Sequence, residues 1–148
     1  MKNRLAEVPK SGIFLYHLCR MPKDFDSWNE KKKYIHDKES IKPYQERDIW
    51  WCSLGVNVGF EEDGTGHNAE RPVLVMKGFS DQVCLTVPLS TALKKNPYYI
   101  GIGSVQGREA SAIISQLRLI DTKRLVNKVG YLNRKKFNII RQAIKEYL

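Results

Sequence analysis

Short hydrophobic runs dominate the chain after residue 45, whereas the part before it is mostly polar. The runs are rich in valine, isoleucine, leucine and aromatic residues, and they are separated by turn-forming residues such as glycine, proline, asparagine and serine. Runs of this length and composition predict β-strands. The predicted strands span residues 48–54, 72–77, 83–89, 98–103 and 111–117. Short strands this close together, with no long helix between them, predict a small β-barrel.

A clear helical period is found at the C-terminal end of the chain. Asn133 can cap a helix in which Phe137, Ile140, Ile144 and Tyr147 fall on one face. We expect this apolar face to pack against the barrel, with the basic residues of the helix near solvent.

The polar part before residue 45 contains one short, highly charged segment with helical character. Ser27 and Glu30 have the spacing of a capping box, which predicts a helix near residues 28–39. The apolar face of this helix is too thin to support independent folding, so we expect it to lean on the main body. The chain therefore divides into a partly helical N-terminal extension, residues 1–44, and a main domain, residues 45–148.

The composition adds a strong positive charge, since 25 lysines and arginines against 16 aspartates and glutamates give a net charge of +9. The charge is uneven, because residues 118–148 hold nine basic residues and two acidic ones. This excess favours polyanions or acidic protein segments as partners. A merely solvated basic helix face is the alternative.

The cysteines and the hydrophobic runs exclude several classes of protein. Cys19, Cys52 and Cys84 are far apart and form no Cys-x-x-Cys pair, so they indicate neither a disulfide framework nor a zinc site and favour a reducing cytoplasm. The run at residues 13–19 is too short to span a bilayer and lacks a small-residue cleavage site. We expect no targeting signal and no membrane segment.

The stretch with the most chemical character runs from residue 47 to residue 75. A strand-like run is followed by a glycine-rich polar loop and then by Arg71 and Pro72, which open the next apolar run. Pro72 favours an extended backbone at Arg71, and this fixes a permanent cation where the loop meets the strand. An arginine held at such a place is suited to bind an anion. A surface salt bridge with a nearby loop glutamate is the alternative.

Several short motifs follow one another through the main domain. They are DIWW at 48–51, GFEEDG at 59–64, RPVLV at 71–75, VPLST at 87–91, SQLRLID at 115–121 and KRL at 123–125. In this order they resemble the MazF/PemK/Kid family of toxins, over about residues 45–148. The resemblance implies a mainly β fold, an SH3-like small barrel with a C-terminal helix, and a homodimer. It also implies a type II toxin–antitoxin endoribonuclease that cuts single-stranded messenger RNA without metal or cofactor and is neutralised by an acidic antitoxin.

The resemblance gives candidate roles to three residues. Arg71 matches the family's arginine, whose planar donor fork suits phosphate stabilisation. Ser90 lies where the family has a hydroxyl residue near the scissile phosphate, although Ser-Thr after a strand more often caps a turn. Glu61 falls on the glutamate of the family's Gly-x-Glu-Gln-x-Gly pattern. A carboxylate beside an arginine stays ionised and can act as a base, and a solvated loop acid is the equal alternative.

A second candidate for proton transfer is His67, because histidine titrates near neutrality. It lies in residues 65–70, which lengthen the loop compared with the family's pattern, and a surface loop position suits it better. Asp121 is interpreted as the cap of a short turn. The residues expected to contact RNA are Thr91, Lys94, Gln116, Arg118 and His67.

Two other functions remain open. Gyrase poisons of the CcdB type are expected on the same fold without cutting RNA, and a non-catalytic RNA-binding module is the other possibility. The pairing of Arg71 with Ser90 favours the nuclease. Many relatives carry an acidic residue at the position of Ser115, and because serine cannot act as a carboxylate base, this departure keeps the non-catalytic reading open.

Overall fold

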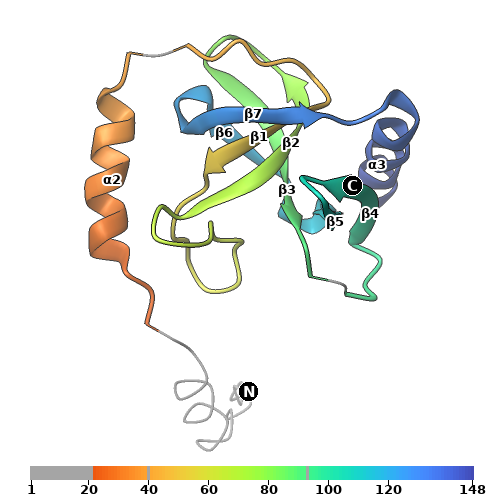
Figure 1. Ribbon diagram of the computed structural model, residues 1–148, viewed down its shortest axis with the longest axis horizontal. Coiled ribbons are helices and arrows are strands. Elements are labelled where there is room, and N and C mark those ends of the chain that lie inside the picture. The colour runs from red at the N-terminus through yellow and green to blue at the C-terminus, as the bar shows by residue number, and fades with distance from the viewer. Residues whose placement is uncertain (1–21, 40, 93) are drawn as a thin grey trace, which may run out of the picture.

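The computed structural model describes residues 22–39, 41–92 and 94–148, in which a seven-stranded antiparallel sheet curls strongly and carries a helix on either side (Figure 1). The sheet order is β4-β5-β3-β2-β1-β7, with β6 paired to β3. In chain order the elements are α2 (Phe25–Asp37), β1 (Asp48–Ser53), β2 (Glu70–Gly78), β3 (Val83–Ser90), β4 (Tyr99–Val105), β5 (Arg108–Ile113), the 3-10 turn η1 (Ile114–Gln116), β6 (Arg118–Asp121), the 3-10 turn η2 (Thr122–Arg124), β7 (Leu125–Tyr131) and α3 (Arg134–Tyr147). The predicted mainly β class with a C-terminal helix and an N-terminal helix is confirmed.

Strand β2 lies at the centre of the fold and is apolar on both faces. Leu74 and Met76 pack on one side with the buried residues of α3, whereas Val73 and Val75 pack on the other with residues of β6 and β7. Successive side chains of a strand point to opposite faces, so a continuous apolar run requires cover on both. The curl of the sheet supplies that cover on the side away from α3.

The last part of the sheet differs from the sequence prediction. Residues 111–117 do not form one strand, because β5 ends at Ile113 and the chain turns into η1 before β6 begins. Strands β6 and β7 were missed. They bury few side chains, and β7 exposes Asn127 and Lys128, so neither has the hydrophobic run that indicates a strand.

Helix α3 confirms the predicted cap and apolar face. The Asn133 side chain accepts a hydrogen bond from the main-chain N–H of Lys136 at 2.8 Å. Phe137 and Ile140 are buried in the main core. Tyr147 is largely exposed, yet its ring packs at an angle of 58° against that of Tyr98, with 4.9 Å between the centroids. The helix thereby also holds the start of the β4–β5 hairpin.

Helix α2 exists as predicted but begins earlier. Its cap is Asp24, whose carboxylate accepts the main-chain N–H of Ser27 at 3.0 Å, so the predicted capping box at Ser27 is wrong. An ionised carboxylate at this position also interacts favourably with the helix dipole. The helix buries Trp28 and Ile35 and does lean on the main body, as expected. No helix among residues 22–39, 41–92 and 94–148 is long and apolar enough to cross a membrane.

Two of the three cysteines lie in the core. Cys52 and Cys84 are buried and free, and burial raises the pKa of the Cys52 thiol to about 12 and that of Cys84 to about 11. Both thiols therefore stay protonated at neutral pH, and a protonated thiol is much less reactive than a thiolate. Cys19 lies outside the described residues. Asp121 caps η2 as predicted, since its side chain accepts the N–H of Lys123 at 2.8 Å.

Candidate active site

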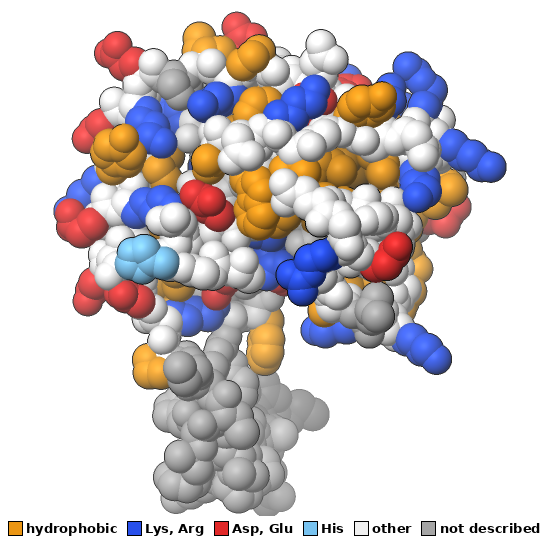
Figure 2. All heavy atoms as spheres, viewed as in Figure 1, with side chains coloured by type: hydrophobic (Ala, Val, Ile, Leu, Met, Phe, Trp, Pro, Cys, Tyr) orange, Lys and Arg blue, Asp and Glu red, His pale blue; other side chains and the backbone are white. Residues whose placement is uncertain are grey.

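A cavity of about 230 Å³ opens where the loop before β2, the end of β3 and the β4–β5 turn come together. Its lining residues are Trp51, Thr65, Arg71, Pro72, Leu89, Ser90, Thr91, Val105, Gln106, Arg108 and Ala110. Figure 2 shows hydrophobic side chains between the β1–β2 side of the sheet and the β4–β5 hairpin, with lysine and arginine side chains around them. The cavity thus combines an apolar wall with two arginines, a suitable lining for an anion attached to a planar ring.

Arg71 reaches the cavity because it is the second residue of β2, opposite Cys52 of β1. Its Nε donates to the main-chain oxygen of Asp63 at 2.7 Å, and its Nη1 donates to that of Leu89 at 3.0 Å. Its Nη2 lies 2.8 Å from Oε1 of Glu62, and the side chain is 14% exposed. Three of the five guanidinium N–H groups are thereby engaged within the described residues, which leaves two to contact a bound anion.

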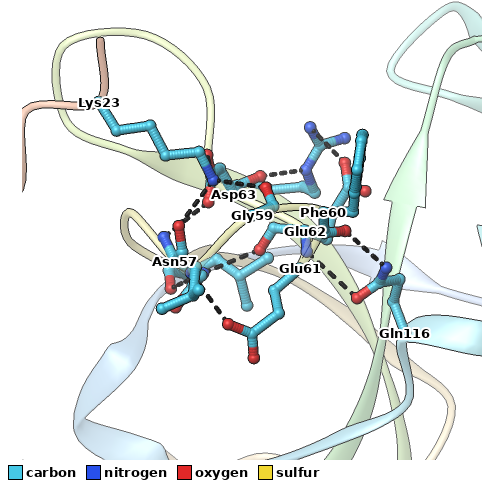
Figure 3. Close-up of polar contacts among 11 residues, drawn as sticks. Lys23, Asn57, Gly59, Phe60, Glu61, Glu62, Asp63 and Gln116 are labelled. Carbon is cyan, nitrogen blue, oxygen red and sulfur yellow. Dashed lines mark hydrogen bonds and ion pairs between the residues drawn. The ribbon is translucent and has the colours of Figure 1, made fainter. Parts of the chain in front are cut away.

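The loop that orients Arg71 is held by its own polar groups. The main-chain N–H of Asn57 donates to Asp63 at 2.7 Å, and the Asn57 side chain donates to the main-chain oxygen of Glu62 at 2.9 Å. Figure 3 shows these contacts together with Lys23, whose ammonium reaches into the same loop from the start of α2. The loop is therefore fixed in the region that contacts the guanidinium.

Gln116 fastens the same loop from the opposite side. Its side-chain oxygen accepts the main-chain N–H of Glu62 at 3.1 Å, and its amide nitrogen donates to the main-chain oxygen of Phe60 at 3.1 Å (Figure 3). Gln116 is the last residue of η1, so the break in the predicted fifth strand aims its side chain at the loop. Gln116 therefore holds the loop and is not part of the cavity lining.

Ser90 and Thr91 lie at the end of β3 and line the cavity together with Arg71. The Ser90 hydroxyl accepts the main-chain N–H of Ala92 at 3.1 Å, which is the turn-capping contact considered as the alternative. Accepting this bond leaves the hydroxyl hydrogen able to turn toward the cavity and donate to an anion. The cap and a phosphate contact are thus compatible.

Residues 45–148 match the family model of the PemK-like, MazF-like toxins of type II toxin-antitoxin systems. The chain belongs to this family. The match covers the whole sheet and α3, and it includes Arg71, Ser90 and the loop between β1 and β2. Helix α2 precedes the matched region.

Solved structures of MazF toxins have the same fold. MazF (Form-I) from Deinococcus radiodurans superposes with a TM-score of 0.60 at 14% identity, covering 70% of this chain and 94% of that one. Toxin MazF-mt6 from Mycobacterium tuberculosis gives 0.53 at 16% identity, covering 68% and 94%. An endoribonuclease in complex with its cognate antitoxin from Mycobacterial species gives 0.52 at 14% identity, covering 70% and 92%. No curated protein sequence is significantly similar to the chain.

The two predicted proton-transfer residues of the toxin lie outside the cavity lining. Glu61 is exposed, and its Oε1 accepts the main-chain N–H of Val58 at 2.9 Å. The loop carboxylate that contacts Arg71 belongs to Glu62 instead. His67 is exposed in the inserted turn and faces a separate cleft beside α2. The role of either residue as a base stays a prediction.

Among the residues expected to contact RNA, Thr91 lines the cavity of the toxin and the others do not. The Lys94 ammonium lies 5.4 Å from the centre of the Tyr99 ring. Arg118 is half-buried on β6, where its main-chain oxygen accepts the hydroxyl of Thr86 at 3.2 Å. Within the described part of the chain, no group of three or more histidine, cysteine, aspartate or glutamate side chains could hold a metal ion.

Sequence reasoning missed part of the cavity. Gln106 and Arg108 reach it from the turn between β4 and β5, and Thr65 reaches it from the inserted segment. The sequence marked a turn at Gln106 and Gly107, but nothing in the local pattern showed that this turn lines the same cavity as Arg71. The signal available was the position of Arg108 directly after that turn.

Proposed function

We propose that this toxin is a sequence-specific endoribonuclease that cleaves single-stranded messenger RNA without a metal ion. The observation that carries the proposal is the Arg71 guanidinium, fixed by three acceptors and lining one cavity with Ser90 and Thr91. A preorganised cation of this kind suits a reaction in which negative charge grows on a phosphate.

The proposed reaction uses the RNA's own 2′-hydroxyl as the nucleophile. The 2′-oxygen forms a bond to the neighbouring phosphorus, and the bond from phosphorus to the 5′-oxygen breaks. A base takes the proton of the 2′-hydroxyl, and the leaving 5′-oxygen gains a proton. The products are a 2′,3′-cyclic phosphate and a free 5′-hydroxyl, so atoms and charge balance without another reactant. Arg71 stabilises the charge on the phosphate oxygens, and Ser90 donates a hydrogen bond to one of them.

The two neighbouring glutamates have different proposed tasks. Glu62 holds the guanidinium of Arg71 through the 2.8 Å ion pair. Glu61 is the proposed base, since its carboxylate is exposed on the loop beside the site. Catalytic contacts are often long before substrate binds, so the place of Glu61 in the free protein is compatible with this role.

RNA binding is proposed to extend beyond the cavity. Arg108 adds a second cation to the lining, and Trp51 offers an aromatic face on which a base can stack. Thr91, Lys94, Gln116, Arg118 and His67 remain the proposed contacts from the sequence. Gln116 would act indirectly, because its amide is bonded to the loop main chain.

A toxin of a type II system is paired with an antitoxin, and we propose an acidic, partly disordered segment as the portion that covers the Arg71 cavity. The net charge of +9 and the two cavity arginines support an acidic partner. Ordering such a segment on a basic surface combines charge steering with apolar anchoring. A homodimer in the cytoplasm is proposed as the form that acts.

The proposal is tested by incubating the purified toxin with single-stranded RNA in EDTA, beside a DNA of the same sequence. We expect defined RNA fragments that end in a 2′,3′-cyclic phosphate, whereas the DNA stays intact because it lacks the 2′-hydroxyl. RNA that is bound in a gel-shift assay but never cut would instead favour the non-catalytic RNA-binding module. Neither binding nor cutting would favour the gyrase-poison alternative.

A further inference from the structure

Helix α2, which precedes the region matched to the family, contacts the turn at residues 65–70, which the sequence resemblance interprets as an inserted turn. In this tight turn the main chains of Thr65 and Glu70 bond to each other. Trp28 and Ile35 of the helix bury Ala69 of this turn. The helix and the inserted turn therefore form one structural unit beside the active-site loop.

Lys23, just before α2, reaches from this unit into the loop. Its ammonium donates to the main-chain oxygens of Asn57 at 2.6 Å and Gly59 at 2.9 Å, and it lies 2.9 Å from Oδ2 of Asp63. A lysine ammonium has three donors, so all of them are used. The side chain is 17% exposed, and Figure 3 shows it directed into the loop. A half-buried ammonium with three acceptors draws together parts of the loop that the hydrogen bonds of Asn57 also join.

Asp63 connects this anchor to the active-site arginine. Its carboxylate binds Lys23 at 2.9 Å and the N–H of Asn57 at 2.7 Å, while its main-chain oxygen accepts Nε of Arg71 at 2.7 Å. A displacement of Asp63 would therefore turn or release the guanidinium. The path from Lys23 to the guanidinium therefore passes through Asp63.

The other end of the loop is anchored by the same helix. Lys31 donates to the main-chain oxygen of Asn68, and its ammonium lies 3.7 Å from Oε1 of Glu70, the first residue of β2. Glu70 directly precedes Arg71. The helix thus holds the loop on both sides of the residues that contact the guanidinium.

We propose that Lys23 is a positioning residue, which orients Arg71 for catalysis by holding Asp63. This inference rests on the proposed nuclease function. It assigns part of the site's geometry to the N-terminal extension, outside the region shared with the family. Lys23 touches neither RNA nor the reacting atoms in this role and acts through the loop.

The test compares Lys23→Met with Lys33→Met in full-length toxin, because Lys33 lies on the exposed face of α2 and pairs with Glu30 of the same helix. Both changes remove one positive charge and keep an unbranched side chain that is one atom shorter. Single-turnover cleavage of RNA in EDTA should fall by about 10- to 100-fold in Lys23→Met, the loss expected from a misplaced catalytic group. KM should stay within about twofold of the wild-type value, and Lys33→Met should cleave at the wild-type rate.

A merely structural role is separated by repeating Lys23→Met in the Arg71→Ala background. If Lys23 acts through Arg71, the added change should have no further effect on the residual rate. An equal fractional loss in both backgrounds would overturn the proposal, as would a Lys23→Met variant that cleaves like Lys33→Met.

Failure of the nuclease proposal itself would be visible separately, as wild-type toxin that cleaves no RNA. In that case amide hydrogen exchange of residues 57–63 decides the positioning role. Faster exchange in Lys23→Met than in Lys33→Met would support Lys23 as the anchor of the loop, and equal exchange would refute it.

Discussion

Glu61 and Glu62, adjacent residues of the loop before β2, have different surroundings, and this difference underlies the role proposed for each. Oε1 of Glu62 pairs with Arg71 at 2.8 Å, whereas Oε1 of Glu61 accepts the N–H of Val58 at 2.9 Å. The Glu62 carboxylate is therefore held by its ion pair with the Arg71 guanidinium. The Glu61 carboxylate caps a turn through one oxygen and remains exposed to an incoming substrate.

This difference predicts unequal effects of two matched substitutions. Glu61→Gln keeps the size of the side chain and deletes the base, so the cleavage rate should fall by about 10²–10⁴-fold. Glu62→Gln keeps a hydrogen bond to Arg71 and loses its charge, so a smaller loss of about tenfold is expected. Single-turnover cleavage measures both. If Glu61→Gln cleaves at the wild-type rate while Glu62→Gln loses most of its cleavage rate, Glu62 is the base. A large loss of rate in His67→Ala would instead make His67 the base.

The sequence could indicate the residues whose placement depends on local backbone. Arg71 before a proline and Ser90 at the end of a strand are fixed by neighbours in the chain, and the structure brings them to one cavity. Lys23 and Arg108 could not be found in this way. Their places depend on contacts across many residues, such as the 2.9 Å pair between Lys23 and Asp63, for which the sequence has no periodic signal.

At the scale of elements, α2 packs closely against the loop after β1. A side-chain carbon added at Gly55 would lie 2.2 Å from the Trp28 ring, and Gly55 has a φ of +89°. Gly66, in the inserted turn, has a φ of +71° and no atom within 4 Å of such a carbon. The two glycines thus share a backbone conformation that favours glycine, but only Gly55 also faces the helix.

The two glycines therefore give a matched test of whether α2 docks as described. Gly66→Ala should lower the free energy of unfolding by about 1 kcal/mol, the cost of a positive φ. Gly55→Ala should cost about 2–4 kcal/mol, because Trp28 must also move away from the new methyl group. Urea denaturation followed by tryptophan fluorescence measures both. Equal losses in the two variants would show that the helix does not press on Gly55.

Element prediction succeeded where the hydrophobic pattern is strong. Strands β1, β2 and β3 and helix α3 were predicted within a few residues of their ends, because an apolar run or a helical period persists through each of them. Strand β7 was not predicted, because it lies at an edge of the sheet and exposes polar side chains. The predicted start of α2 is wrong because Asp24, and not Ser27, caps the helix.

For the molecule as a whole, the curled sheet brings the start of β2, the end of β3 and the β4–β5 turn to one cavity with two arginines in its lining. The surplus of 25 basic over 16 acidic residues gives the chain a net charge of +9, and Arg71 and Arg108 line the cavity itself. Long-range attraction of this sign speeds the approach of RNA and of an acidic antitoxin alike. Substrate and antitoxin are therefore expected to compete for the same surface.

The most direct measurement is the rate of RNA cleavage by Arg71→Ala in EDTA, with circular dichroism and thermal unfolding to show that the variant stays folded. The guanidinium contacts the loop and β3 but lies outside the three hydrophobic core clusters, so the fold should persist. Loss of a preorganised group that stabilises the transition-state charge should reduce the rate by about 10²–10³-fold. A folded Arg71→Ala variant that cleaves single-stranded RNA at the wild-type rate would contradict the assignment of this cavity as the active site.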